Sequence, residues 1–289
     1  MTRRLKQREL FFLLLLILCC GFSVHAGELK LKVSGGLSYL QLGSINRNLQ
    51  DWILFHRAFA EAEPDWTLLE ENVSTFHSAF DFSAEFLTYF SSRLAVGAGA
   101  GFLYGELNEE KTQVINEQIG KSVYLNIRPN KASGLLLTGS AYYFQPIGRK
   151  IQIYLCGGGG LIWAKFVSRE SSKKLEDLRF RNYVTQKASA KSPVFFGSLG
   201  TAFRIDTAIE FVIEGSIRKA VAKDFFGTND DGDSGTLYYY EQYLPAYDIW
   251  QSNTRILTDL PSGQNYRNIE EAEIDFSGFS VKAGLLIKF

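Results

Sequence analysis

The chain has 289 residues with 31 basic and 31 acidic side chains, and this balance gives no electrostatic case for binding nucleic acid. Its 23 Phe, 14 Tyr and 26 Gly favour a sheet protein that needs an aromatic band on one face and glycines where strands bend. Past the first 26 residues, no stretch is long and apolar enough for a transmembrane helix, which excludes a helical membrane protein.

The N-terminus has the pattern of a secretory signal peptide. Basic residues precede an apolar run over residues 10–20, and small residues at 24–26 suit a cleavage site. We therefore predict a cleaved leader over residues 1–26 and a mature domain over residues 27–289. Loss of the leader removes four bases and one acid and leaves 27 bases against 30 acids, a net charge of −3. Cys156 is then the only cysteine, so no intrachain disulfide can hold the fold.

Eight segments of the mature chain alternate apolar and polar residues with a period of two, which predicts strands with one apolar and one polar face. They are Leu29–Gly43, 79–90, Leu94–Gly105, Leu135–Pro146, Ile151–Val167, Val194–Ile205, Ile209–Val221 and 279–289. Tight turns alternate with long connections along this series. The faces of the fourth segment stay open, because they depend on whether the turn at 147–150 has two or three residues.

The tight turn after Phe90 fixes the register of one hairpin. Pairing Phe90 with Leu94 sets Glu85 opposite Gly99, so that a glycine faces a long side chain across the pair. The phenylalanines of both strands then share the other face. The two strands therefore agree on which face is apolar.

The long connections carry further signals. Within residues 44–77, a stripe at spacings of three and four predicts an amphipathic helix that ends before Pro64 and caps the barrel mouth; a partner surface is the alternative. The stripe consists of Leu49, Trp52, Ile53, His56, Phe59 and Ala60. Residues 106–134 form a polar connection and 168–193 a basic loop. The acidic segment 222–275 is rich in Tyr, which could bind an extracellular protein or ligand, form an aromatic girdle or extend the sheet.

The last predicted strand ends on Phe289; its free edge would promote aggregation, and closing the sheet into a barrel would give it partners on both sides. Together with the leader and the alternating connections, this terminal aromatic resembles the small eight-stranded outer-membrane barrels of the OmpA, OmpX and OmpW kind. The resemblance implies an all-β fold, an eight-stranded antiparallel up-and-down transmembrane β-barrel with long extracellular loops, in the outer membrane of a Gram-negative cell. It also implies that the barrel-assembly machinery reads the C-terminal strand, with Phe289 in the insertion signal. No catalytic motif and no cofactor come with it.

A soluble secreted barrel such as a lipocalin would show the same alternation with its apolar face turned inward. The interior of an eight-stranded barrel is only just filled by side chains. Here the apolar face carries many Phe, whereas the polar face offers Gly, Ala and Ser around a few charges. We therefore expect the phenylalanines of residues 80–90 to face lipid and the small and charged residues to face the axis.

Charged residues on the polar face must be paired or solvated, because a low-dielectric wall penalises a lone charge. The expected lumen charges are Lys30, Lys32, Asp81, Glu85, Arg204, Glu210, Glu214, Arg218, Lys282 and Lys288. A tight turn sets Arg204 opposite Glu210, and we expect ion pairs such as this one to plug the lumen. The predicted function is a structural or surface-interaction role without catalysis. A narrow channel for small or apolar solutes is the alternative.

Two weaker signals concern chemistry. His77 beside Ser78 raises a lipid-modifying enzyme as a second alternative, but neighbours on a strand point to opposite faces and cannot easily act as base and nucleophile. Asp230, Asp233 and Glu241 match part of a calcium loop. A glycine occupies one ligand place, so a solvated acidic turn is the preferred interpretation and no metal site is expected.

Overall fold

The structure is a computed structural model. It describes residues 28–62, 66–71, 77–106, 110–116, 121–127, 131–174, 180–245 and 248–289. The predicted leader, residues 1–26, lies outside the described residues.

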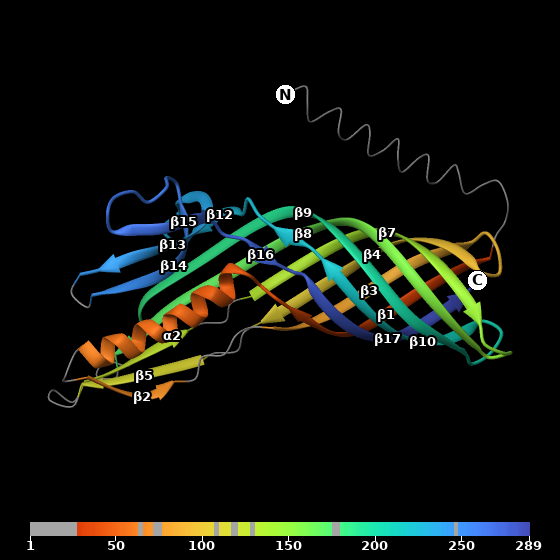
Figure 1. The fold of residues 1–289 in the computed structure, drawn as a ribbon, viewed down its shortest axis with the longest axis horizontal. Helices are drawn as coiled ribbons and strands as arrows, with labels where there is room; N and C mark the ends of the chain where they lie inside the picture. The colour runs from red at the N-terminus through yellow and green to blue at the C-terminus, as the bar shows by residue number, and fades with distance from the viewer. Residues whose placement is uncertain are drawn as a thin grey trace, which may run out of the picture.

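Eight antiparallel strands form a closed barrel, as the sequence predicts (Figure 1). They are β1 (Leu29–Leu40), β3 (Ser78–Tyr89), β4 (Leu94–Glu106), β7 (Lys131–Pro146), β8 (Ile151–Lys174), β9 (Phe180–Arg204), β10 (Ile209–Lys219) and β17 (Gly278–Lys288). Their order is β9-β10-β17-β1-β3-β4-β7-β8, and β8 pairs with β9 to close the ring. Closure leaves the barrel itself without a free edge.

Tight turns set the register at one end of the barrel. Glu85 lies opposite Gly99, and Glu210 lies opposite Arg204, as predicted. The β7–β8 turn has three residues between Ile147 and Ile151, whose backbones are joined by a 2.8 Å hydrogen bond. This turn settles the faces of β7. Leu135, Leu137 and Tyr143 point outward, and Leu136, Tyr142 and Phe144 point into the lumen.

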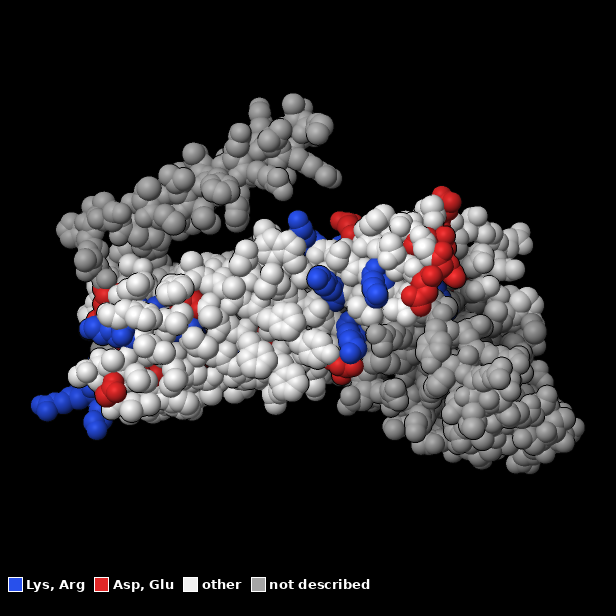
Figure 2. All heavy atoms as spheres, turned by 180° about the vertical axis from the view of Figure 1, so that it is seen from behind, with Lys and Arg blue, Asp and Glu red and all other residues white. Residues whose placement is uncertain are grey.

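The apolar face of the barrel points outward. Phe80, Phe82, Phe86 and Phe90 expose 54%, 53%, 55% and 69% of their surface, whereas Asp81 on the opposite face is buried. On the face seen in Figure 2, a broad band across the barrel wall shows no charged side chain, and charges gather on either side of it. Such a band must lie in hydrocarbon, so the chain is a transmembrane barrel and the lipocalin alternative is wrong.

Above the band, the long connections form strands rather than loops. β8 and β9 continue to Lys174 and from Phe180, so the basic segment 168–193 is mostly strand; this corrects the prediction of a loop. The connection 106–134 contains β5 (Glu110–Asn116) and β6 (Lys121–Ile127), and β2 (Trp66–Glu71) pairs with β5. β5 and β6 were missed because the connection is polar and charge-balanced overall, and short strands within it stand out less than the long alternating segments of the barrel wall.

The segment 222–275 extends the same sheet, which was one of the three expectations for it. Its strands in that sheet are β12 (Phe226–Asn229), β13 (Ser234–Leu244), β14 (Ile249–Leu257) and β15 (Tyr266–Glu271). β11 (Val221–Ala222) and β16 (Ile274–Asp275) pair with each other in a separate two-stranded sheet. β12 joins β13 to β9, and β14 forms the outer edge. Tyr239 of β13 is buried and bonds to Asp51 and Ser252, each at 3.0 Å.

The predicted amphipathic helix is α2 (Ser44–Ala62). Ile45 and Leu49 are buried in one cluster with inward-facing barrel residues such as Leu103 and Ile162, so the start of the helix caps the lumen as expected. The side chains of Trp52, Ile53, His56 and Phe59 lie outside the described residues. The part of the sheet above the band, at the end of the long connections, is called here the extracellular sheet. α2 also contacts β14 and β2, the strands at the two ends of its strand order. No helix in the described ranges is long and apolar enough to cross a membrane.

Candidate functional site

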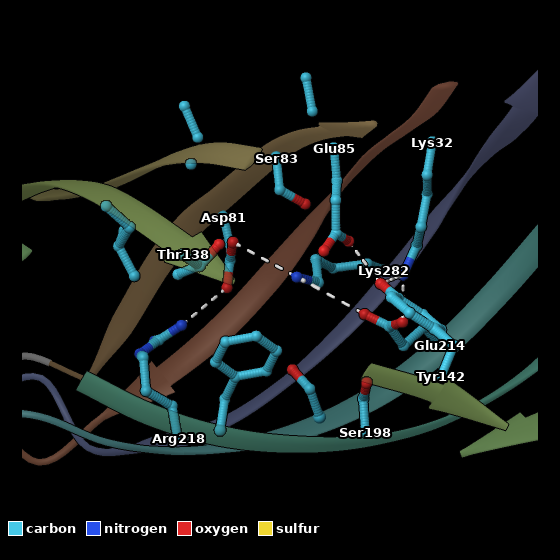
Figure 3. A pocket seen from close by; sticks show the side chains of 16 residues that line it. Lys32, Asp81, Ser83, Glu85, Thr138, Tyr142, Ser198, Glu214, Arg218 and Lys282 are labelled. Carbon is cyan, nitrogen blue, oxygen red and sulfur yellow. Dashed lines mark hydrogen bonds and ion pairs between the residues drawn. The ribbon is translucent and has the colours of Figure 1, made fainter. Parts of the chain in front are cut away.

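A network of buried charges crosses the middle of the lumen. Asp81 and Glu85 on β3, and Glu214 and Arg218 on β10, are each four residues apart, so both pairs face inward. Lys32 on β1 and Lys282 on β17 come from the strands between them. Figure 3 shows these side chains converging from four strands.

Asp81 and Glu214 each bind two cations, and Lys282 links them. Arg218 Nη1 lies 2.9 Å from Asp81 Oδ2, and Lys282 Nζ lies 3.7 Å from both Asp81 Oδ1 and Glu214 Oε1. Lys32 donates to the other oxygen of Glu214, and the Tyr154 hydroxyl donates to the same carboxylate at 3.0 Å. These contacts form a continuous chain from Arg218 to Lys32.

Neutral groups complete the hydrogen bonding at both ends of the chain, and at the Lys32 end the Tyr142 hydroxyl, 3.3 Å from Lys32 Nζ, extends the network to Glu85. Arg218 also donates to the Ser38 hydroxyl at 2.9 Å and to the Phe276 carbonyl at 3.1 Å. Glu85 accepts hydrogen bonds from the hydroxyls of Ser140 and Tyr142. Three bases and three acids therefore meet here, so the layer is neutral overall, as a buried network must be to avoid a large desolvation penalty.

A glycine makes the central contact possible. Gly36 on β1 lies opposite Asp81 on one side and Lys282 on the other. Because Gly36 has no side chain, Asp81 and Lys282 can meet across the strand between them. A Cβ at Gly36 would lie 1.9 Å from the Val281 carbonyl oxygen, so the site admits no larger residue without a shift of the backbone.

A second ion pair lies at the periplasmic end, and its partners differ from the expected ones. Lys30 Nζ lies 2.9 Å from Glu210 Oε1, whereas Arg204 is exposed at the mouth. The predicted Arg204–Glu210 ion pair is therefore wrong, although the two residues are paired in register. The reason is desolvation: buried Lys30 needs a buried counter-charge, while Arg204 can be hydrated. Lys288 is also at the mouth and lies 3.1 Å from Glu28.

Aromatic side chains close the lumen between the charge network and the periplasm, and the sequence argument missed them. Tyr142 and Phe144 of β7 and Tyr154 of β8 are buried together, with ring centroids 5.4 to 5.8 Å apart. They share a cluster with Leu87 and Leu286. The prediction of a lumen filled by Gly, Ala and Ser was therefore incomplete. Tyr142 and Phe144 were missed because the sequence did not decide which residues of β7 face the lumen. Tyr154 could have been predicted, because it lies opposite Gly200 and a glycine leaves room for a large side chain across the pair.

Little empty space remains around the network. A cavity of about 70 Å³ lies beside Lys32, Asp81, Glu85 and Glu214, which is room for a few ordered waters. On the other side, an apolar cluster that includes Phe166, with inward residues of β4, β7 and β8, fills the extracellular part of the lumen under α2. The lumen thus has an aromatic layer, a charged layer and an apolar layer.

The residues singled out for chemistry have structural contacts. His77 Nδ1 lies 2.8 Å from the Leu40 carbonyl oxygen, and its ring stacks on Tyr39. Asp230 accepts a bond from the Thr185 amide at 2.6 Å. Within the ranges that the structure describes, no group of three or more His, Cys, Asp or Glu residues is placed to hold a metal ion.

Glu241 is separated from the other two calcium candidates by its own partners. Arg267 donates to it at 2.5 Å and Asn268 at 2.7 Å, both from β15. Asp233 lies in the β12–β13 turn, where Asn229 donates to it at 3.2 Å. The structure thus does not bring Asp230, Asp233 and Glu241 together.

Comparisons with known proteins add a limited likeness. No protein-family model matches the sequence, and no curated protein is significantly similar to it. Among solved structures, the outer membrane protein OprG from Pseudomonas aeruginosa matches at 11% identity with a TM-score of 0.41, over 91% of this chain and 96% of that one. The outer membrane protease OmpT from Escherichia coli matches at 8% identity with a TM-score of 0.42, over 91% of this chain and 97% of that one. Likeness at this level assigns no activity, ligand or partner. The closed barrel and its lipid-facing band make the chain an eight-stranded β-barrel protein of the outer membrane.

Proposed function

We propose that this outer-membrane barrel has a closed lumen and acts through its extracellular sheet, in a structural or surface-interaction role. The observation that carries the proposal is the stack of three filled layers along the axis. A permeating ion would have to displace the aromatic rings of Tyr142, Phe144 and Tyr154 and then break the ion pairs of Asp81 and Glu214. The charged layer is neutral overall, which gives no selectivity for one sign of ion.

Single-channel recording in planar bilayers tests the closed lumen. The folded protein is expected to give no steady conductance. A variant with Asp81→Ser, Arg218→Ser, Phe144→Ala and Tyr154→Ala, checked for folding by heat-modifiable gel migration, should give small open-channel currents and so show that the recording can detect a pore. Large, steady currents from the unmodified protein would overturn the proposal.

The two alternatives predict different contacts from those seen. A passage for apolar solutes needs an apolar route along the whole axis, but the Asp81–Lys282–Glu214 layer interrupts it. A lipid-modifying enzyme needs a nucleophile within reach of its base, but the His77 ring stacks on Tyr39, and Ser78, its neighbour along the chain, points to the opposite face of the strand. We therefore propose a barrel without catalytic activity. A lipid hydrolysis activity that His77→Ala abolishes would contradict this view.

The extracellular sheet offers the surface for a partner. Tyr243 and Trp250 pack with ring centroids 5.2 Å apart, and the Arg267 guanidinium lies 4.1 Å above the Trp250 ring. Tyr, Trp and Arg dominate the binding energy of protein interfaces. Deletion of β13 and β14 should therefore abolish capture of a surface ligand while the barrel still folds.

Phe289 is proposed as part of the signal read by the barrel-assembly machinery. Its side chain is 71% exposed and therefore adds little packing to the folded barrel. Phe289→Ala should slow assembly in cells while leaving the stability of the refolded barrel unchanged. A matching loss of stability would mean that the residue acts in the fold instead.

A further inference from the structure

Three lysines lie together on the outer surface of the β8–β9 hairpin, just above the apolar band. Lys165 pairs in register with Ser189, and Lys187 and Lys191 lie two positions to either side of Ser189 on β9. All three side chains are exposed and share the outward face. Diagonal neighbours of this kind lie about 7 to 8 Å apart. We call Lys165, Lys187 and Lys191 the lysine patch.

The position of the lysine patch relative to the bilayer follows from the strands that carry it. On β8, the outward residue Leu161 belongs to the band, Trp163 follows, and Lys165 comes next. Trp residues favour the membrane–water interface. Two residues advance a strand by about 7 Å, and the head-group layer is about 5 to 8 Å deep on each side of the bilayer. The patch therefore lies at the depth of lipid head groups, on the side of the long loops, which is the outer leaflet.

The charges of the lysine patch are not neutralised within the described part of the chain. No carboxylate lies within 4.0 Å of Lys165, Lys187 or Lys191 among the residues described there. Two other lysines on the extracellular side are paired with carboxylates. Lys131 lies 2.7 Å from Glu106, and Lys223 lies 3.0 Å from Glu273. Figure 2 shows basic side chains gathered at the extracellular edge of the uncharged band.

The Lys191 ammonium lies 5.9 Å from the Trp163 ring centroid, so this side chain turns toward the band rather than into solvent. Long lysine stems lie along apolar surface and hold their charge at the interface. An anion that meets the patch at this depth is a head-group phosphate. A soluble protein would have to enter the bilayer surface to reach it.

We propose that the lysine patch binds the phosphate groups of outer-leaflet lipids and so fixes a shell of anionic lipid against the β8–β9 hairpin. The proposal requires only the membrane position of the barrel, so it stands or falls independently of the closed lumen. Lys187 and Lys191 each lie about 7 to 8 Å from Lys165 as its diagonal neighbours, and they lie about 13 Å from each other along β9. A basic patch of this extent suits a lipid with more than one phosphate, or two neighbouring lipids.

Electron spin resonance of spin-labelled lipids in vesicles containing the folded barrel tests the proposal. Spin-labelled phosphatidic acid should associate with the barrel roughly fivefold more strongly than spin-labelled phosphatidylcholine. Lys165→Gln, Lys187→Gln and Lys191→Gln together should remove most of this preference, and Lys→Arg at the same three positions should keep it. Heat-modifiable migration confirms that each variant is folded.

A matched control removes the same charge from the periplasmic turns. Arg149→Gln, Lys150→Gln and Arg204→Gln change exposed residues at the opposite mouth and should leave most of the preference intact. An equal loss in both triple variants would show that general charge, not the lysine patch, selects the lipid and would overturn the proposal. So would displacement of the labelled lipid by millimolar inorganic phosphate beyond the effect of chloride at equal ionic strength, because the patch would then be a site for soluble anions.

Discussion

Asp81 is the residue on which the charged layer depends most, because it alone binds both Arg218 and Lys282. We predict that Asp81→Ala destabilises the barrel by about 3 kcal/mol or more, since it leaves the buried Arg218 without a counter-charge. Urea unfolding of the barrel in lipid vesicles measures the effect. The double variant Asp81→Leu with Arg218→Met should recover part of the loss, because it removes both charges. A single variant as stable as the parent would show that water solvates Arg218 in the lumen.

Substitution of Gly36 and of Gly157 by alanine distinguishes the effect of steric crowding from the effect of restricting the backbone. A Cβ at Gly36 would meet the Val281 carbonyl oxygen at 1.9 Å, whereas a Cβ at Gly157 would meet nothing within 4 Å. Gly36→Ala should therefore severely lower the fraction of the protein that folds. Gly157→Ala should be neutral or slightly stabilising. Refolding yield, read as heat-modifiable gel migration, compares the two. Equal yields would mean that β1 can move away from β17.

At the scale of strands, the sequence predicts most where one face meets lipid. The phenylalanines of residues 79–90 lie at alternate positions and so share one face. This pattern and the three-residue turn after Phe90 were enough to place Glu85 opposite Gly99. The same logic stops in the polar and charged segments 106–134 and 168–193, which is why β5, β6 and the upper parts of β8 and β9 were expected to be loops or connections. Register also does not choose ion-pair partners. Arg204 lies opposite Glu210, yet Lys30 takes that carboxylate because it is the more deeply buried cation.

The pairing of β13 with β15 should depend on acid through Glu241. Burial raises the pKa of this carboxyl, but hydrogen bonds from Asn268 and Arg267, and the Arg267 and Arg47 charges, more than offset burial and hold it below its ordinary value of 4.5. A folded-state pKa below the unfolded one means that Glu241 stabilises the pair above pH 4.5 and that this contribution is lost as pH falls through the lower value.

We therefore predict faster opening of residues 266–271 as the pH drops below about 4.5. Amide hydrogen exchange, corrected for the intrinsic pH dependence of the rate, measures the opening. Glu241→Gln should remove most of the pH dependence and open faster at neutral pH. Identical pH profiles for both proteins would assign the acid sensitivity to another group.

For the whole molecule, the outward orientation of the apolar strand faces explains both the lipid-facing surface and the packing of the lumen. The outward phenylalanines and leucines leave the lumen to short, charged and aromatic residues, and the lumen is then narrow enough for side chains from four strands to meet. The same closure removes the barrel's edges. Above the membrane the sheet opens, and α2 contacts β14 and β2, the strands at the two ends of its strand order. Edge strands covered in this way are protected from pairing with other chains.

Arginine substitutions at Leu199 and Leu260 test whether the outer face of the barrel contacts hydrocarbon or water. Their side chains are 56% and 57% exposed, but Leu199 lies within the apolar band, on the outward face of the barrel part of β9, and Leu260 follows β14 in the extracellular part. An arginine in mid-bilayer costs about 2 to 4 kcal/mol, whereas one in water costs little. Leu199→Arg should therefore lower the free energy of unfolding in vesicles by about that amount, and Leu260→Arg should leave it unchanged. In a soluble barrel both substitutions would be equally tolerated, because equal exposure to water gives equal solvation. Matching unfolding curves for the two variants would therefore contradict the membrane-spanning arrangement from which the lumen and the lysine patch take their positions.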